Sequence, residues 1–321
     1  MDIRCAARLK RAEIPWPLEM VTAEDEKMNG ILVIDKPPGL TSHDVVNRVR
    51  RLLGERAVGH LGTLDPMATG VLPLVIGRMT RLAQFYTNAE KTYEGEIRFG
   101  FATDTYDADG EPSGQVSEVQ PLLEDVRAQA AQFQGEIEQV PPPFSAKKIK
   151  GVPAYRLARG KRPVALAPVK VEIKEFQILG LQGDRASFRA RVASGTYLRS
   201  VAHEMGIRLA LGAHLASLRR SALAEFDLSQ SHTLEEVQSA VGTRELEPIF
   251  VPPRRVLPQF PAVSATDELS TLVLHGRAVN LPDLSRARLV KVFRGQGELI
   301  AIAARVAGTM FHPKVVLGAG S

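Results

Sequence analysis

Apolar residues recur every three or four positions between Thr41 and Leu53, which predicts an amphipathic helix over this segment. Thr41 and Asp44 have the spacing of a capping box, and Gly54 follows the last apolar residue, so both ends of the helix are marked. The arginines of the opposite face should lie in solvent. The predicted buried stripe consists of Val45, Val46, Val49, Leu52 and Leu53.

Apolar and polar residues alternate with a period of two in three further segments, which is typical of half-buried strands. These segments cover residues 92–99, 169–174 and 185–192. Because the strands come in runs and do not alternate strictly with helices, the pattern favours an α+β domain with a mixed, largely antiparallel sheet and flanking helices. A second amphipathic helix has its apolar stripe at Leu198, Val201, Ala202, Met205 and Leu209.

Near the C-terminus, the proline-rich segment 251–258 can sustain neither a helix nor a central strand, and it predicts a linker. Beyond it, we expect a short helix that ends at Gly276, followed by several short strands. On this pattern alone the unit is a small β-barrel. The expected strands cover residues 289–293, 299–303 and 314–317.

The pattern divides the chain into four parts. Residues 1–28 mix acidic and basic side chains without a continuous apolar segment, so we expect a poorly ordered extension and not a signal peptide. Translation could equally begin at Met28, which precedes the first predicted domain. The other parts are a larger domain over residues 29–250, a linker over residues 251–262 and a small β unit over residues 263–321.

Composition narrows the classes of function. The chain has 41 Lys and Arg residues against 36 Asp and Glu residues, and this net charge of +5 favours a polyanionic partner. Its single cysteine, Cys5, excludes a disulfide framework and a thiolate zinc cluster, which fits a reducing cytoplasm. There is no apolar run of about 18 residues, which argues against a membrane span. The acidic segment 104–110 lacks the outer ligands of a calcium loop, and no motif demands a nucleotide, a cofactor or a metal.

One carboxylate, Asp65, stands in the apolar, glycine-rich segment 59–72. Leu64 and Met67 flank it with side chains that can exclude water, and Pro66 disfavours a helical conformation at the preceding residue. Two interpretations follow. Asp65 either caps a helix that begins with proline, or it is a carboxylate held in place for chemistry.

Four segments of the chain resemble, in order, the motifs of the TruB family, the bacterial tRNA pseudouridine(55) synthases. They cover residues 35–42, 59–72, 91–93 and 194–200, within a match from about Asn29 to about Arg220. More loosely, the C-terminal unit resembles a PUA domain, a small RNA-binding β-barrel. The resemblance implies a pseudouridine synthase fold with a PUA-like β-barrel, no cofactor or metal, and isomerisation of uridine to pseudouridine at position 55 in the T loop of tRNA.

The resemblance also assigns roles to residues. Asp65 matches the family's catalytic aspartate, a nucleophile or base, and Arg199 would pair with it and keep it ionised by lowering its pKa. Tyr93 would stack on the flipped-out uridine, and His60 would help to flip it. The sequence does not decide whether Asp65 attacks the sugar C1′, adds to the base C6 or abstracts a sugar proton.

Three further residues, Tyr197, Lys148 and Leu218, match positions that line the family's pocket. Lys147 stands where the family often has an apolar residue, so the sequence does not decide which of the two lysines faces the site. The resemblance further implies that the partner is the T arm of tRNA and that the protein is a monomer. Guide-dependent relatives share these motifs, but the chain lacks lysine-rich tails, so we expect no required protein partner. The expected location is the cytoplasm, as the cysteine content already indicates.

Two other classes of function compete with this interpretation. A non-catalytic tRNA-binding protein that helps tRNA to fold would need only the basic charge and a PUA-like domain. A glycoside hydrolase requires two cooperating carboxylates. Since only Asp65 stands in a context typical of a catalytic group, the hydrolase is the weaker alternative.

Overall fold

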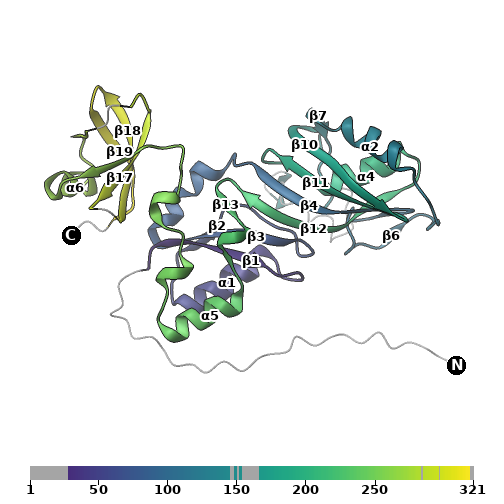
Figure 1. The fold of residues 1–321 in the computed structure, drawn as a ribbon, viewed down its shortest axis with the longest axis horizontal. Coiled ribbons are helices and arrows are strands. Elements are labelled where there is room, and N and C mark those ends of the chain that lie inside the picture. The colour runs from purple at the N-terminus through teal and green to yellow at the C-terminus, as the bar shows by residue number, and fades with distance from the viewer. Residues whose placement is uncertain are drawn as a thin grey trace.

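The computed structural model contains a large mixed sheet and a small C-terminal sheet. In Figure 1 the large sheet extends across the centre and right of the view, and the C-terminal sheet lies at the upper left. The predicted extension before Met28 lies outside the described residues. The structure describes residues 28–144, 166–282, 285–295 and 297–318, together with the backbone of residues 148–149 and 152–153.

The large sheet and its helices take up most of the chain. Its first elements are β1 (Gly30–Lys36), α1 (Ser42–Leu53), β2 (Val58–His60), β3 (Thr69–Ile76), η1 (Gly77–Tyr86), β4 (Lys91–Phe99), β5 (Ala102–Thr103), β6 (Pro112–Ser113), α2 (Leu123–Ala131) and β7 (Gly135–Gln139). They are followed by β8 (Lys148–Ile149), β9 (Val152–Pro153), β10 (Val169–Gln182), β11 (Arg185–Val192), α4 (Leu198–Arg208), β12 (Ala213–Leu223), β13 (Phe226–Asp227), η2 (Leu228–Gln230), β14 (Ser231–His232) and α5 (Leu234–Thr243).

The strands of the large sheet follow the order β14-β1-β3-β12-β4-β11-β10-β7, with β2 beside β3 and β13 beside β12. Neighbouring strands are antiparallel except in the pairs β1–β14 and β3–β12. Apolar residues of α1, α2, α4 and α5 share one core with one face of this sheet. The predicted α+β class, with a mixed, largely antiparallel sheet and flanking helices, is confirmed.

The predicted helix and strands of this domain are confirmed as well. At the start of α1 the Thr41 side chain accepts from the Asp44 N–H and the Asp44 carboxylate accepts from the Thr41 N–H, while Gly54 ends the helix with a φ of 65°. Every second residue of β11 is buried, as its alternation predicts. Strand β10 runs on to Gln182, beyond the predicted end at 174, because its second half pairs with β11. Leu209 lies just after α4 and is only partly buried.

The C-terminal sheet has the order β15-β17-β18-β19-β16, and α6 packs against it. Helix α6 ends at Leu274 and Gly276 follows with a φ of 76°, close to the predicted end. This small sheet is consistent with the predicted PUA-like β-barrel. The elements of this part are η3 (Glu247–Ile249), η4 (Pro253–Arg255), β15 (Ala262–Ala265), α6 (Asp267–Leu274), β16 (Val279–Asn280), β17 (Leu289–Arg294), β18 (Glu298–Ala307) and β19 (Met310–Val316).

The segment predicted as a linker is packed between the two sheets. Val251 donates its N–H to the carbonyl of Ile31 at 2.8 Å, and Val256 and Leu257 are buried. Both belong to a hydrophobic cluster that joins the outer face of β1 and β3 to the C-terminal sheet. The ammonium of Lys291 also donates to two carbonyls of this segment. The apolar residues between the prolines therefore complete a core, and the domain limits themselves remain predictions.

Candidate active site

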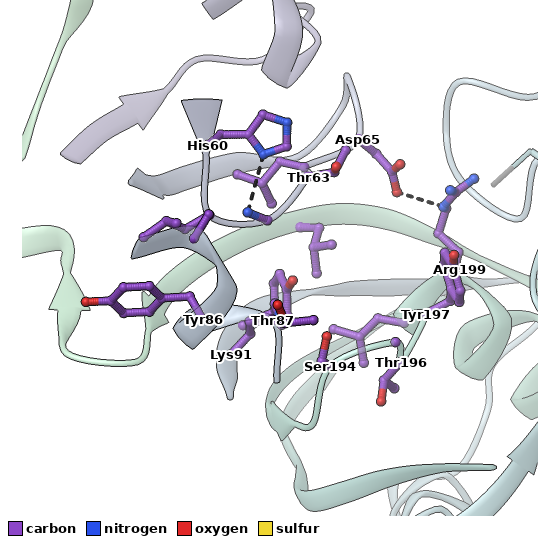
Figure 2. Close-up of a pocket in the computed structure, with 18 residues that line it drawn as sticks. His60, Thr63, Asp65, Tyr86, Thr87, Lys91, Ser194, Thr196, Tyr197 and Arg199 are labelled. Atoms are coloured by element: carbon purple, nitrogen blue, oxygen red, sulfur yellow. Dashed lines mark hydrogen bonds and ion pairs between the residues drawn. The ribbon is translucent and has the colours of Figure 1, made fainter. Parts of the chain in front are cut away.

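Most of the residues singled out from the sequence line one cleft, shown in Figure 2. Its volume is about 400 Å³, which lies within the range of small-ligand pockets. The loop between β2 and β3, the end of η1, strands β4 and β12 and the start of α4 form its walls. The predicted site residues in its lining are His60, Asp65, Tyr93, Tyr197, Arg199 and Leu218.

Asp65 lies in the irregular loop 61–68 and not at the start of a helix, so the helix-cap interpretation is wrong. The carbonyl of the next residue, Pro66, accepts hydrogen bonds from the Gly39 N–H at 2.9 Å and from Lys36 Nζ at 3.2 Å. A helix would use such a carbonyl internally. Here the bonds come from the last residue of β1 and from the segment after it, so contacts distant in sequence fix the loop.

A buried hydroxyl ties the same loop to α1. Ser42 Oγ donates to the carbonyl of Leu64 at 3.0 Å and accepts from its N–H at 2.8 Å. Ser42 is 2% exposed, so water cannot take over either bond. The pair of bonds therefore sets the path of the chain directly before Asp65.

Replacing Ser42 by alanine should lower the free energy of unfolding by about 1–3 kcal/mol, because both backbone groups of Leu64 lose their buried partner. Urea unfolding measures this loss. Ser239→Ala, on the exposed side of α5, is the matched control and should change stability by less than about 0.5 kcal/mol. Equal effects of the two substitutions would show that Ser42 does not brace the loop.

Arg199, in the first turn of α4, lies beside Asp65 in the lining of the cleft. Its Nε lies 2.9 Å from Asp65 Oδ2, the ion pair drawn in Figure 2. The Arg199 side chain is 5% exposed whereas that of Asp65 is 35% exposed, so the carboxylate is the member of the pair that faces the cleft. The other guanidinium nitrogens donate to the carbonyls of Thr105 at 3.1 Å and Phe144 at 2.9 Å. The guanidinium therefore has a fixed orientation.

A second carboxylate, Asp107, contacts the same guanidinium and was missed by sequence reasoning. Its Oδ2 lies 3.3 Å from Arg199 Nη1, and its side chain is 6% exposed. It belongs to the acidic turn 104–110, where its Oδ1 accepts from the Thr105 hydroxyl and the Asp109 N–H. The sequence shows an acidic turn but contains no spacing that connects it to Asp65 or Arg199, so nothing in the pattern singles out this residue.

Burial raises the pKa of Asp65 above the ordinary value of an aspartate. Arg199 lowers it and Asp107 raises it, while Lys36 lowers it to a smaller extent. Arg199 therefore lowers the pKa of Asp65 as predicted, but burial has the larger effect and the pKa is raised overall. A carboxylate of this kind protonates at a higher pH than an exposed one, and its ionisation depends on the neighbouring cations.

His60, the last residue of β2, lies on the same side of the cleft as Thr63 and Asp65 in Figure 2. Its Nδ1 accepts from the Gly62 N–H at 3.3 Å. Burial, Arg220 and His43 lower the pKa of this imidazole, so it is neutral at pH 7 and carries its proton on Nε2.

The remaining predicted residues differ in how the structure places them. Tyr93, on β4, is 8% exposed, and Leu218, on β12, is 9% exposed. The N–H and carbonyl of Tyr197 both bond to the side-chain amide of Gln139, which fixes the backbone before α4. Lys148 lies in β8, but its side chain falls outside the described residues, as does Lys147.

A lysine that was not assigned a role also lines the cleft. Lys91 begins β4, and its Nζ donates to the carbonyl of Ala89 at 2.8 Å. Burial and the charge of Arg220 lower its pKa to about 8. Lys91 belongs to the motif at residues 91–93, from which the sequence analysis assigned a role only to Tyr93.

Neither a metal site nor a membrane helix is found in the described part of the chain. Within these residues, no three His, Cys, Asp or Glu side chains gather into a possible metal site. No helix in the same part is both long and apolar enough to cross a membrane.

Two family models match consecutive segments that together cover residues 50–257. The model described as TruB family pseudouridylate synthase (N terminal domain) matches residues 50–198, and the tRNA pseudouridylate synthase B C-terminal domain matches residues 199–257. The tRNA pseudouridine synthase B of Solibacter usitatus is 47% identical over 293 residues, which are 90% of this chain and 100% of that protein. The enzyme of the same name from Aquifex aeolicus is 37% identical over 292 residues, with the same two coverages.

Solved structures show that the likeness extends to the fold. A chain in the crystal structure of a Cbf5-Nop10-Gar1 complex superposes with a TM-score of 0.67 and 25% identity, over 91% of this chain and 85% of that one. The large sheet with its helices is therefore a pseudouridine synthase fold. By the two matching models and by the full-length relatives, this chain belongs to the TruB family of pseudouridine synthases.

Proposed function

We propose that this protein converts uridine to pseudouridine at position 55 in the T loop of tRNA, with Asp65 as the catalytic carboxylate. The observation that carries the proposal is the placement of Asp65 in the lining of the cleft, where it is partly exposed and forms an ion pair with the buried Arg199. Family membership supports the reaction, and the basic net charge suits an RNA substrate.

The reaction breaks the bond between N1 and C1′, rotates the uracil and forms a new bond from C1′ to C5, so no atom of the uridine skeleton is lost. It needs an ionised carboxylate, and Arg199 favours that form of Asp65. Sugar attack, addition to the base and proton abstraction all use this same carboxylate. No step requires a redox group.

The uridine must leave its stack to reach Asp65, which costs a few kcal/mol. A ring of Tyr93 that stacks on the base would return about 1–3 kcal/mol. We infer that His60 occupies the space that the base vacates, because its neutral ring lines the same cleft as Asp65. Tyr197 and Leu218 would hold the detached base, and Lys148 is proposed as a further contact.

The proposed substrate contact is the T arm of tRNA, bound by a monomer without an obligatory protein partner in the cytoplasm. The PUA-like unit would add RNA contacts outside the cleft. Its packing against β1 and β3 supports a single RNA-binding surface, because the two sheets share a hydrophobic core.

Release of tritium from T-loop RNA that carries 5-tritiated uridine tests the reaction, because bond formation at C5 expels this label. We expect release from RNA with uridine at position 55, and none when only this uridine is replaced by cytidine. RNA binding without release would instead support the non-catalytic tRNA-binding function.

The pH dependence of the same assay tests the electrostatics of the site. The single-turnover rate should fall as the pH drops through the raised pKa of Asp65, because the carboxylate must be ionised. Asp107→Asn removes a charge that raises this pKa, so the acid limb should move to lower pH. Asp104→Asn, an equal charge change on an exposed residue of the same turn, is the control and should leave the limb in place. An acid limb at the same pH in Asp107→Asn as in the wild type would contradict the assignment of Asp65 as the catalytic carboxylate.

A further inference from the structure

Arg220, on β12, is a fully buried arginine directly beneath the catalytic loop, with 0% of its surface exposed. Its Nε donates to the carbonyl of Val71 at 2.7 Å, Nη1 to Thr63 at 3.3 Å and Nη2 to Gly62 at 3.0 Å. All three nitrogens of the guanidinium therefore hold backbone on the two sides of Asp65.

The charge of Arg220 has no anionic partner within the described residues, where no Asp or Glu forms an ion pair with it. The positive charge of Arg220 lowers the pKa of three nearby basic groups, Lys36, His60 and Lys91. A buried, unpaired cation is costly to keep. Because an apolar side chain of similar size would avoid this cost, we expect the guanidinium of Arg220 to have a role beside the cleft that an apolar side chain could not perform.

Hydrogen bonds connect Arg220 to His60 through Gly62. The carbonyl of Gly62 accepts from Arg220, and its N–H donates to Nδ1 of His60. Gly62 has a φ of 127°, a backbone conformation that side chains other than glycine rarely adopt, so this position favours glycine. Arg220 thus acts on the residue that orients the imidazole.

The same arginine fixes the chain that leads to Asp65. It holds the carbonyl of Thr63, and Ser42 holds Leu64, so three consecutive residues before Asp65 have bonded carbonyls. The backbone of Arg220 also pairs with Gly70 of β3, just after the loop.

We propose that Arg220 is a positioning residue for the isomerisation, which holds the backbone of residues 62–63 so that His60 and Asp65 keep their places in the cleft. The inference rests on the proposed roles of those two residues. It assigns Arg220 no contact with the RNA, because its side chain is fully buried.

The test compares Arg220→Met, which keeps the bulk, with Arg220→Lys, which keeps the charge but cannot reach three carbonyls. Both should lower the single-turnover rate about 100-fold, the cost of a displacement of about 1 Å at a reacting group, while the Kd for T-loop RNA changes less than about threefold. The control is Arg219→Met on the same strand, whose side chain is 41% exposed and pairs with Asp35. It should keep the wild-type rate.

Titration of His60 by NMR gives a readout that does not depend on activity, with the signal assigned by its loss in His60→Gln. The pKa of His60 should rise in Arg220→Met, since one of its lowering charges is gone, and should stay low in Arg220→Lys. His43 and burial remain in both variants. If Arg220→Met does not fold, the single-turnover rate of Arg220→Lys still tests the positioning role.

Rates of both Arg220 variants equal to that of Arg219→Met would overturn the proposal, and so would a loss that appears entirely as weaker RNA binding. Tritium release by the wild type distinguishes a failure of the proposed function from a failure of the positioning role of Arg220. If the wild type releases none, the proposed function fails, whereas a wild type that reacts alongside unaffected Arg220 variants refutes only the positioning role.

Discussion

Asp65→Asn should lower the rate of pseudouridine formation by about 10⁴-fold or more while T-loop RNA still binds, because the amide can neither attack nor abstract a proton. The substitution preserves the shape of the side chain and leaves Arg199 bound to the carbonyls of Thr105 and Phe144. Single-turnover tritium release gives the rate, and filter binding gives the Kd.

The same variant should unfold at the same temperature as the wild type or at a higher one. Burial raises the pKa of Asp65 in the folded protein, so the folded state binds this proton more readily than the unfolded state. At neutral pH the ionised form therefore costs stability, and a neutral amide removes that cost. Asp104→Asn controls for the charge change and should keep full activity. Equal tritium release by Asp65→Asn and the wild type would mean that another carboxylate performs the reaction.

Local pattern predicted two of the elements that line the cleft, β4 and α4, but not β2, β3, η1 or β12. The alternation in β4 and β11 and the capping box of α1 depend on residues close together in sequence, and each survives in the fold. The contact between Asp65 and Arg199 was predicted from the family resemblance alone, because periodicity does not show which residues 134 positions apart lie close together in the fold.

The residues that sequence reasoning missed share a physical cause. Lys36, Asp107 and Arg220 are charged but buried, and each has at least one partner that is distant in sequence. A charge in a sequence is ordinarily read as an exposed one. The burial of Val256 and Leu257 between the sheets was likewise not predicted, because prolines mark irregular backbone without showing whether that backbone is buried.

Arg199→Met should both destabilise the protein and inactivate it. The substitution leaves Asp107, 6% exposed, without its cation, which should lower the free energy of unfolding by about 3–5 kcal/mol. It also removes a charge that lowers the pKa of Asp65 and the group that orients its carboxylate, so the rate should fall about 10³-fold. Urea unfolding and single-turnover tritium release measure the two effects.

The double variant Arg199→Met/Asp107→Asn separates these effects. It removes the stranded charge of Asp107, so most of the lost stability should return, whereas the rate should stay low because Asp65 still lacks its partner. Arg199→Lys keeps one cation and should lose less stability than Arg199→Met, but it cannot bond Thr105, Phe144 and both carboxylates at once. A double variant that regains activity together with stability would show that Arg199 supports only the fold, and that Asp65 needs no cation to react.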